Sequence, residues 1–270
     1  MKIKNGLIFF LMTYASAFAA EVLPTETDPN KIMAAVEKRE EGDRSRSVMV
    51  MEVVDDQGRR RSRTLTAWMK HFDEGRKQLM IFNAPADVAG TGLLSLDYND
   101  GARADDQWLY LPSLKKSTRI SSGEKSGSFM GTDLTYSDMT QSDPKDYEFK
   151  LLKAEVMVGN EACWLIESRP ATARVKSETG YQKSKIWVSK TKLMPLQLKA
   201  WVIEGRKLKY IRFDDIRNVD GIWVAHKISA RTIRNKKVES TTVLSFSEFV
   251  LNQEQVTDDL FTQKKLQEGL

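Results

Sequence analysis

Hydrophobic and polar positions alternate along most of this chain in the way that β-strands require. Runs rich in Val, Ile, Trp, Phe and Thr, such as SVMVMEVV, SRTLTAWMKHF and GIWVAHKISARTI, lie between short turn signals. These turn signals are centred on Gly58, Gly75, Gly101, Gly159, Gly205, Gly221 and Asn235. Strands that are joined by such short turns pair antiparallel with their neighbours. The pattern therefore predicts an antiparallel meander.

The strands differ in whether one face or both faces are apolar. Near residue 200, Leu196 and Leu198 point one way while Gln197 and Lys199 point the other. The runs SVMVMEVV and LMIF are apolar on both faces, which indicates apolar material against each side of the sheet. We therefore predict a strongly curved sheet with a helix or lid over its concave face.

Helical signals occur at the two ends of the mature chain. Asp28 is a suitable N-cap, Pro29 suits the first helical position, and Gly42 ends this first predicted helix. A second short helix, capped by Thr257 or Asp258, is predicted near the C-terminus.

The first residues, MKIKNGLIFFLMTYASAFAA, have the pattern of a secretory signal peptide. A basic start precedes an apolar core of about nine residues, which is short of the roughly 20 that a membrane-spanning helix needs. We expect cleavage after Ala19, so that residues 1–19 are removed and residues 20–270 form a single domain. A retained membrane anchor is the alternative.

Composition narrows the class of protein. The formal net charge is +5, and removal of Lys2 and Lys4 leaves +3, which is too weak and too evenly spread to indicate nucleic-acid binding. Cys163 is the only cysteine, so neither an intramolecular disulfide nor a multi-cysteine metal site can form.

The sequence offers little catalytic chemistry. The chain has two histidines, His71 and His226, and no G-x-S-x-G context around any serine. The run SSGEKSGSFMG lacks the spacing of a phosphate-binding loop. We therefore expect no catalytic residue, no metal and no cofactor, and we expect that the protein is not an enzyme.

Nine methionines and six tryptophans give the mature chain many large, adaptable apolar side chains. Methionine is over-used where a surface must fit varied apolar ligands. An ordinary core and an apolar cavity inside the curved sheet both fit this observation.

Three longer motifs, PADVAGTGLL, WLYLPSLKK and GSFMGTDLTYSDM, resemble the outer-membrane lipoprotein-sorting (LolA-like) family of Gram-negative bacteria. The resemblance extends over nearly the whole mature chain. It implies an incomplete, strongly curved antiparallel β-barrel with helices covering the concave face. It also implies a periplasmic carrier, or chaperone, that binds acyl chains of lipoproteins or lipids in a hydrophobic cavity and transfers them toward the outer membrane.

This interpretation gives a set of predicted site residues. The cavity candidates are Met49, Met51, Leu65, Trp68, Leu79, Ile81, Trp108, Tyr110, Leu196 and Leu198. A glycine- and serine-rich loop, residues 121–131, and a short helix near residues 133–139 are the predicted gate. The lid candidates in it are Phe129, Met130, Leu134 and Tyr136. Lys116 and Arg119 are candidates for contact with a polar head group at the cavity rim.

Two other functions stay open at this point. A soluble periplasmic adaptor of an inner-membrane exporter would dock on a transporter and carry no lipid cargo. An esterase would need His71 or His226 to meet a serine and an acid. For the carrier we expect a monomer whose partners are an acyl chain, an inner-membrane transporter and an outer-membrane acceptor, with no nucleic acid.

Overall fold

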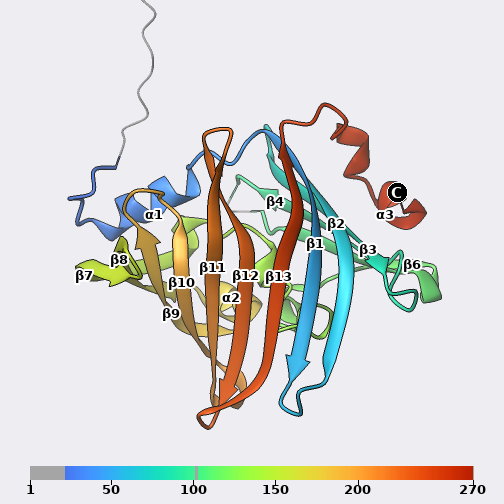
Figure 1. The fold of residues 1–270 in the computed structure, drawn as a ribbon. Helices are drawn as coiled ribbons and strands as arrows, with labels where there is room; N and C mark the ends of the chain where they lie inside the picture. The colour runs from blue at the N-terminus through green and yellow to red at the C-terminus, as the bar shows by residue number, and fades with distance from the viewer. Residues whose placement is uncertain (1–21, 101–102, 270) are drawn as a thin grey trace, which may run out of the picture.

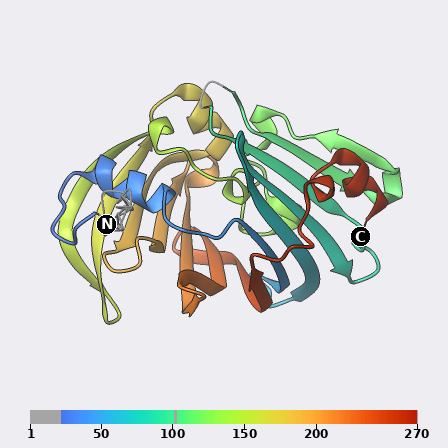
Figure 2. The ribbon, with the colours of Figure 1, turned by 90° about the horizontal axis from the view of Figure 1, so that it is seen from above.

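The computed structural model describes residues 22–100 and 103–269, so the predicted cleavage at Ala19 lies outside the described residues. Thirteen strands form one antiparallel sheet in the order β6-β5-β4-β3-β2-β1-β13-β12-β11-β10-β9-β8-β7. Figures 1 and 2 show that the sheet curves into an open half-barrel. The predicted incomplete, strongly curved antiparallel barrel is confirmed.

The elements follow the chain in two wings. α1 (Pro29–Glu37) comes first in the chain and packs on the second wing. The first wing contains β1 (Arg44–Asp55), β2 (Arg60–Phe72), β3 (Gly75–Ala84), β4 (Gly92–Tyr98), β5 (Asp106–Leu111) and β6 (Lys116–Arg119). The second wing contains β7 (Tyr147–Val158), β8 (Glu161–Pro170), α2 (Ala173–Thr179), β9 (Tyr181–Ser189), β10 (Pro195–Val202), β11 (Lys207–Val219), β12 (Ile222–Arg234) and β13 (Lys237–Leu251). The chain ends with α3 (Gln263–Glu268). The two wings form one continuous sheet, because β13 of the second wing pairs with β1 of the first.

The concave face of the sheet carries the main core. Met51, Leu65 and Phe82 from the first wing lie in one buried cluster with Ile211 and Leu244 from the second. Side chains from both wings meet here because the sheet is strongly curved. Alternation along β1 produces this face, since every second residue from Ser45 to Val53 is buried.

A second cluster covers the opposite, convex face of the first wing. Leu79 and Ile81 of β3 pack there against Phe261 and Leu266 of the C-terminal segment. Gly92 permits this close approach, because a Cβ atom at that position would lie 2.6 Å from Leu266 Cδ1. The C-terminal segment is therefore a second cover of the sheet, on the face away from the main core.

The helices differ in part from the sequence prediction. Asp28 caps α1 as expected, but α1 ends at Glu37 and not at Gly42. The predicted C-terminal helix is a 3-10 turn (Asp258–Leu260) followed by α3, which is capped by Thr262. The predicted helix near residues 133–139 is only the 3-10 turn Ser137–Met139. Finally, α3 packs on the convex face rather than the concave face.

Candidate functional site

The segment of residues 121–141, which we name the plug, crosses the concave face of the sheet. Phe129 is fully buried, with its ring centroid 6.0 Å from Phe82 and 5.7 Å from Tyr136. Leu134 lies in the same cluster. The plug therefore fills the middle of the half-barrel with its own apolar side chains, although its sequence is rich in glycine and serine.

Asp133 fastens the plug to the second wing. Its carboxylate accepts hydrogen bonds from the hydroxyl groups of Thr232, Ser240 and Thr242, the last at 2.7 Å. The backbone N–H of Asp133 donates to Thr242 Oγ1 at 2.9 Å. A buried carboxylate is costly unless hydrogen-bonded, and these three hydroxyls supply the bonds.

Asp138 forms a second attachment, five residues further along. Lys209 Nζ lies 3.0 Å from Asp138 Oδ2 and donates to the Tyr181 hydroxyl at 2.7 Å. The Tyr181 hydroxyl lies 2.8 Å from each carboxylate oxygen of Asp138. Burial, followed by the charge of Asp138, raises the pKa of Tyr181 well above its usual value, so the phenol stays protonated and can donate.

The first wing holds the plug through its backbone carbonyls. Arg63 Nη1 donates to the Met130 carbonyl at 2.6 Å, and Gln107 Nε2 donates to the Tyr136 carbonyl at 2.9 Å. Together with Asp133 and Asp138, these contacts attach the plug to both wings.

An apolar groove remains between the plug and the concave face of the sheet. One lobe, of about 380 Å³, runs from α1 along β9 to β12. The other, of about 390 Å³, continues beneath β1, β2 and β12. The two lobes share Met139, Phe213, Ile228 and Leu244 in their walls, so they meet at the plug. Each is within the size range typical of small-molecule sites.

The groove wall is formed by alternate residues of neighbouring strands. Leu198 of β10 lies opposite Ile186 of β9 and Ile211 of β11, and all three line the first lobe. Met33 and Val36 of α1 close the end of this lobe. These strands provide an apolar wall, while the plug contributes polar groups such as Asp138 and Thr140.

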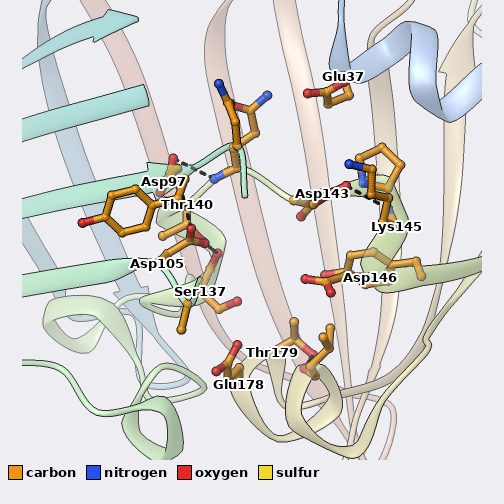
Figure 3. A pocket seen from close by; sticks show the side chains of 18 of the residues that line it. Glu37, Asp97, Asp105, Ser137, Thr140, Asp143, Lys145, Asp146, Glu178 and Thr179 are labelled. Atoms are coloured by element: carbon orange, nitrogen blue, oxygen red, sulfur yellow. Dashed lines mark hydrogen bonds between the residues drawn. The ribbon is translucent and has the colours of Figure 1, made fainter. Parts of the chain in front are cut away.

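A polar cavity of about 520 Å³ adjoins the first lobe (Figure 3). Both are lined by Ser137, Thr140, Gln141 and Tyr147. Asp97, Asp105 and Glu178 also line the polar cavity. An amphiphilic molecule in the groove would therefore find a polar compartment beside its apolar part.

Burial raises the pKa values of two carboxylates in this cavity. Burial raises the pKa of Asp97, although Arg76 Nη2 lies only 2.9 Å from its carboxylate. Burial and then the nearby charge of Asp97 raise the pKa of Asp105 to about 6, against the opposing effect of its hydrogen bond from the Tyr98 N–H at 2.9 Å. The charge of the cavity therefore changes in mildly acidic conditions.

Replacing Asp105 with asparagine should stabilise the protein at pH 7. The pKa of Asp105 is higher in the folded state than in the unfolded state, so the folded state binds the proton more tightly. The contribution of Asp105 to the free energy of unfolding therefore falls as pH rises from about 4 to about 6. Asparagine cannot ionise, and its oxygen can still accept from Tyr98. Since Asp105 is partly exposed, we expect a gain of about 1 kcal/mol at pH 7 and none at pH 4. Denaturant unfolding at both pH values measures this, and an equal change at both would contradict it.

The structure divides the predicted cavity residues between the two faces of the sheet. Met49, Met51 and Leu65 lie in the concave core, and Leu198 packs against it. Met49 and Leu198 also line the groove. Met51 and Leu65 pack with Phe82 deeper in the core.

The other cavity candidates have different positions. Leu79, Ile81, Trp108 and Tyr110 pack on the convex face with the C-terminal segment, so the sequence placed them on the wrong face. Trp68 belongs to the same convex cluster and borders the second lobe. Leu196 packs in a separate cluster with Cys163 and Met194, because a β-bulge interrupts the alternation between Pro195 and Gln197.

The lid and rim candidates are also clearly placed. Phe129 and Leu134 are buried in the core, and Met130 and Tyr136 pack against it. Arg119 forms a salt bridge with Asp106 on the outermost strands of the first wing. Lys116 is exposed on the same edge strand, and neither basic side chain lines the groove or the polar cavity.

Sequence reasoning missed the residues at the junction of the two lobes, which are Met139, Phe213, Ile228 and Leu244. The signal for three of them was present, because each occupies an alternating apolar position of a strand. Met139 carries no local signal, since its position depends on the attachment of the plug.

The side chains considered for catalysis are in structural positions. Cys163 is buried, and burial raises the pKa of its thiol to about 11, which keeps it protonated. His226 is buried against the ring of Phe249 at 6.1 Å. Within residues 22–100 and 103–269, no group of three or more His, Cys, Asp or Glu side chains is arranged to hold a metal ion.

Membrane-spanning helices can be assessed in the same part of the chain. None of the helices in it combines the length and the apolar character needed to cross a bilayer.

Comparison with solved structures places this geometry in a known class. The chain is 29% identical, with a TM-score of 0.79, to a Vibrio parahaemolyticus domain assigned to outer-membrane lipoprotein sorting, over 88% of this chain and 98% of that one. It is 28% identical, again with a TM-score of 0.79, to a DUF1329 family protein from Desulfovibrio piger, over 89% and 100%. A LolA superfamily protein from Nitrosomonas europaea shares the fold at 19% identity, with a TM-score of 0.65 over 89% and 100%.

An open antiparallel sheet wrapped around a plug and an apolar groove defines a LolA-like protein, as the resemblance of the three sequence motifs indicated. No curated protein matches the chain. A family model described only as that of an uncharacterized protein matches residues 74–268, and the chain belongs to this family.

Proposed function

We propose that the groove binds an acyl chain of a lipid or a lipoprotein and that the protein carries it through the periplasm toward the outer membrane. The observation that supports this most is the two-lobed apolar groove between the plug and the concave face of the sheet. A LolA-like fold with a lipoprotein-sorting relative is consistent with the same function.

The physical basis is the cost of exposing hydrocarbon to water. Each CH₂ group that leaves water contributes about 0.8 kcal/mol, so a long chain gains several kcal/mol even in a partly filled groove. The groove is lined by soft or aromatic side chains such as Met33, Met139 and Phe213. Methionine can adapt its shape to different chains, which suits a carrier of several related lipids.

Release of the cargo requires the apolar contacts to be broken. The plug forms one wall of both lobes, because Asp138, Met139 and Thr140 line each of them. A shift of this segment would open the groove and lower its affinity. We propose that an inner-membrane transporter supplies the cargo and that an outer-membrane acceptor receives it.

The test is native mass spectrometry of the full chain isolated from the periplasm of its own cells without detergent. We expect a population heavier than the protein by the mass of a lipid, released when the sample is extracted with organic solvent. A protein that is always found empty, yet co-purifies with an inner-membrane exporter, would contradict the carrier function and support the adaptor function.

A further inference from the structure

Three hairpin turns lie together at one end of the sheet. The register pairs Asp55 with Ser240 and Lys207 with Arg234. The β1–β2 turn (residues 56–59), the β10–β11 turn (203–206) and the β12–β13 turn (235–236) are therefore neighbours. Figure 1 shows them at the lower end of the half-barrel, and we name this end the tip.

The tip is strongly basic. Residues 55–61, 204–207 and 234–239 contain eight Lys or Arg side chains and four Asp or Glu side chains. Five of these cations are exposed, and no carboxylate of the described residues lies within 4.0 Å of them. They are Arg60, Arg61, Arg206, Lys236 and Lys237. The tip thus carries much of the positive charge that the whole chain has in excess.

The basic surface continues onto the convex face beside the tip. Lys185 of β9 lies between Lys199 of β10 and Glu167 of β8, which are its partners on the two neighbouring strands. Lys199 Nζ lies 4.8 Å and Lys183 Nζ 5.0 Å from the ring centroid of Trp201. Lys183, Lys185 and Lys199 outnumber the Glu167 carboxylate on this face, which leaves the face positively charged.

Large apolar side chains are exposed between these cations. Ile203 is 45% exposed and lies in the β10–β11 turn, and Val238 is 43% exposed and lies two residues after the β12–β13 turn. Trp201 of β10 lies opposite Leu208 of the neighbouring strand β11, so an apolar pair of side chains lies beside the lysines. Exposed aliphatic groups and a tryptophan among lysines and arginines are typical of surfaces that enter a membrane interface.

We propose that the tip docks on the surface of a membrane that contains anionic phospholipids. Lys and Arg side chains attract the negatively charged head groups, while Ile203, Val238 and Trp201 enter the interface. A purely acidic protein partner would leave the exposed apolar side chains without a role. This proposal does not depend on which cargo the groove binds.

Docking at the tip would also bring the membrane close to the plug. Arg61 Nη2 lies 3.5 Å from the Gly131 carbonyl, and Arg63 donates to the neighbouring Met130 carbonyl. Arg61 thus lies between the docking surface and the segment that covers the groove.

The experiment is vesicle co-sedimentation of the mature chain. We compare vesicles of phosphatidylcholine alone with vesicles that also contain about one third phosphatidylglycerol, at low and at physiological salt. We expect binding about tenfold tighter to the anionic vesicles, weakened by salt. A triple variant, Arg206→Glu, Lys236→Glu and Lys237→Glu, should lose about tenfold in affinity for them.

A second triple variant shows whether binding depends on the charge of the tip or on the net charge of the whole protein. Lys116→Glu, Lys153→Glu and Lys264→Glu change the net charge equally at exposed positions of β6, β7 and α3, and should alter binding by less than about twofold. The pair Ile203→Ser and Val238→Ser should weaken binding without any change of charge. Equal losses in the two triple variants, or no preference for anionic vesicles, would overturn the proposal, as would binding only to an acidic protein.

Discussion

Replacing Asp133 with alanine is expected to release the plug from the second wing and to lower the free energy of unfolding by about 3 kcal/mol. Asp133 is only 5% exposed, and its carboxylate accepts hydrogen bonds from Thr232, Ser240 and Thr242. Alanine leaves these hydroxyls without their common acceptor. Hydrogen exchange of the plug amides, followed by mass spectrometry, should accelerate more than exchange in the sheet.

Two further variants show whether the effect is specific. Asp133→Asn keeps an acceptor oxygen and should cost less than alanine. Asp143→Ala removes only a cap of the 3-10 turn Pro144–Asp146, so it should leave exchange of the plug unchanged. If Asp133→Ala exchanges its plug amides at the wild-type rate, the plug is held by its apolar contacts and not by this carboxylate.

Replacing Leu198 with aspartate should weaken acyl-chain binding by at least about tenfold. Leu198 is partly exposed and lies in the wall of the first lobe, between Ile186 and Ile211. A carboxylate at that position remains hydrated in the empty groove and must lose water when a hydrocarbon chain enters. Titration with a fluorescent fatty acid measures the loss.

The adjacent residue provides the control for this variant. Gln197 lies on the same strand with its side chain on the opposite face, because successive strand residues alternate. Gln197→Asp should bind the fluorescent fatty acid as the wild type does, with an unchanged melting temperature. Equal loss in both variants would indicate a general effect of charge on the sheet, and no loss in Leu198→Asp would place the ligand elsewhere.

The sequence predicted the strands well because their turns carry strong local signals. Each of Gly58, Gly159, Gly205 and Gly221 lies at a hairpin turn, as its neighbours indicated. In β10, alternation also separated Leu198 on the groove side from Gln197 and Lys199 on the other face. Local pattern suffices where a strand has one apolar and one polar face.

Face assignment failed where both faces are apolar. In β3, Leu79 to Phe82 are all buried, so alternation cannot distinguish the concave from the convex side. Met80 and Phe82 face the main core, whereas Leu79 and Ile81 meet the C-terminal segment. That segment lies about 180 residues away in sequence, and its docking leaves no periodic signal in β3.

The plug shows a similar limit. Its glycines and serines are typical of a mobile loop, and its real order depends on distant partners. Asp133 and Thr242 are separated by 109 positions, and Asp138 and Lys209 by 71. No short motif encodes such contacts, although the plug was correctly placed on the concave side by the family resemblance.

A carrier function requires that an acyl chain lies in the groove between the plug and the concave face of the sheet. The most direct measurement is photo-crosslinking with a fatty acid that carries a diazirine near the middle of its chain, followed by peptide mapping. We expect adducts on groove residues such as Met139, Leu198, Phe213 and Ile228, and their loss when unlabelled fatty acid competes. Adducts confined to the convex face, or labelling that competitor does not reduce, would contradict it.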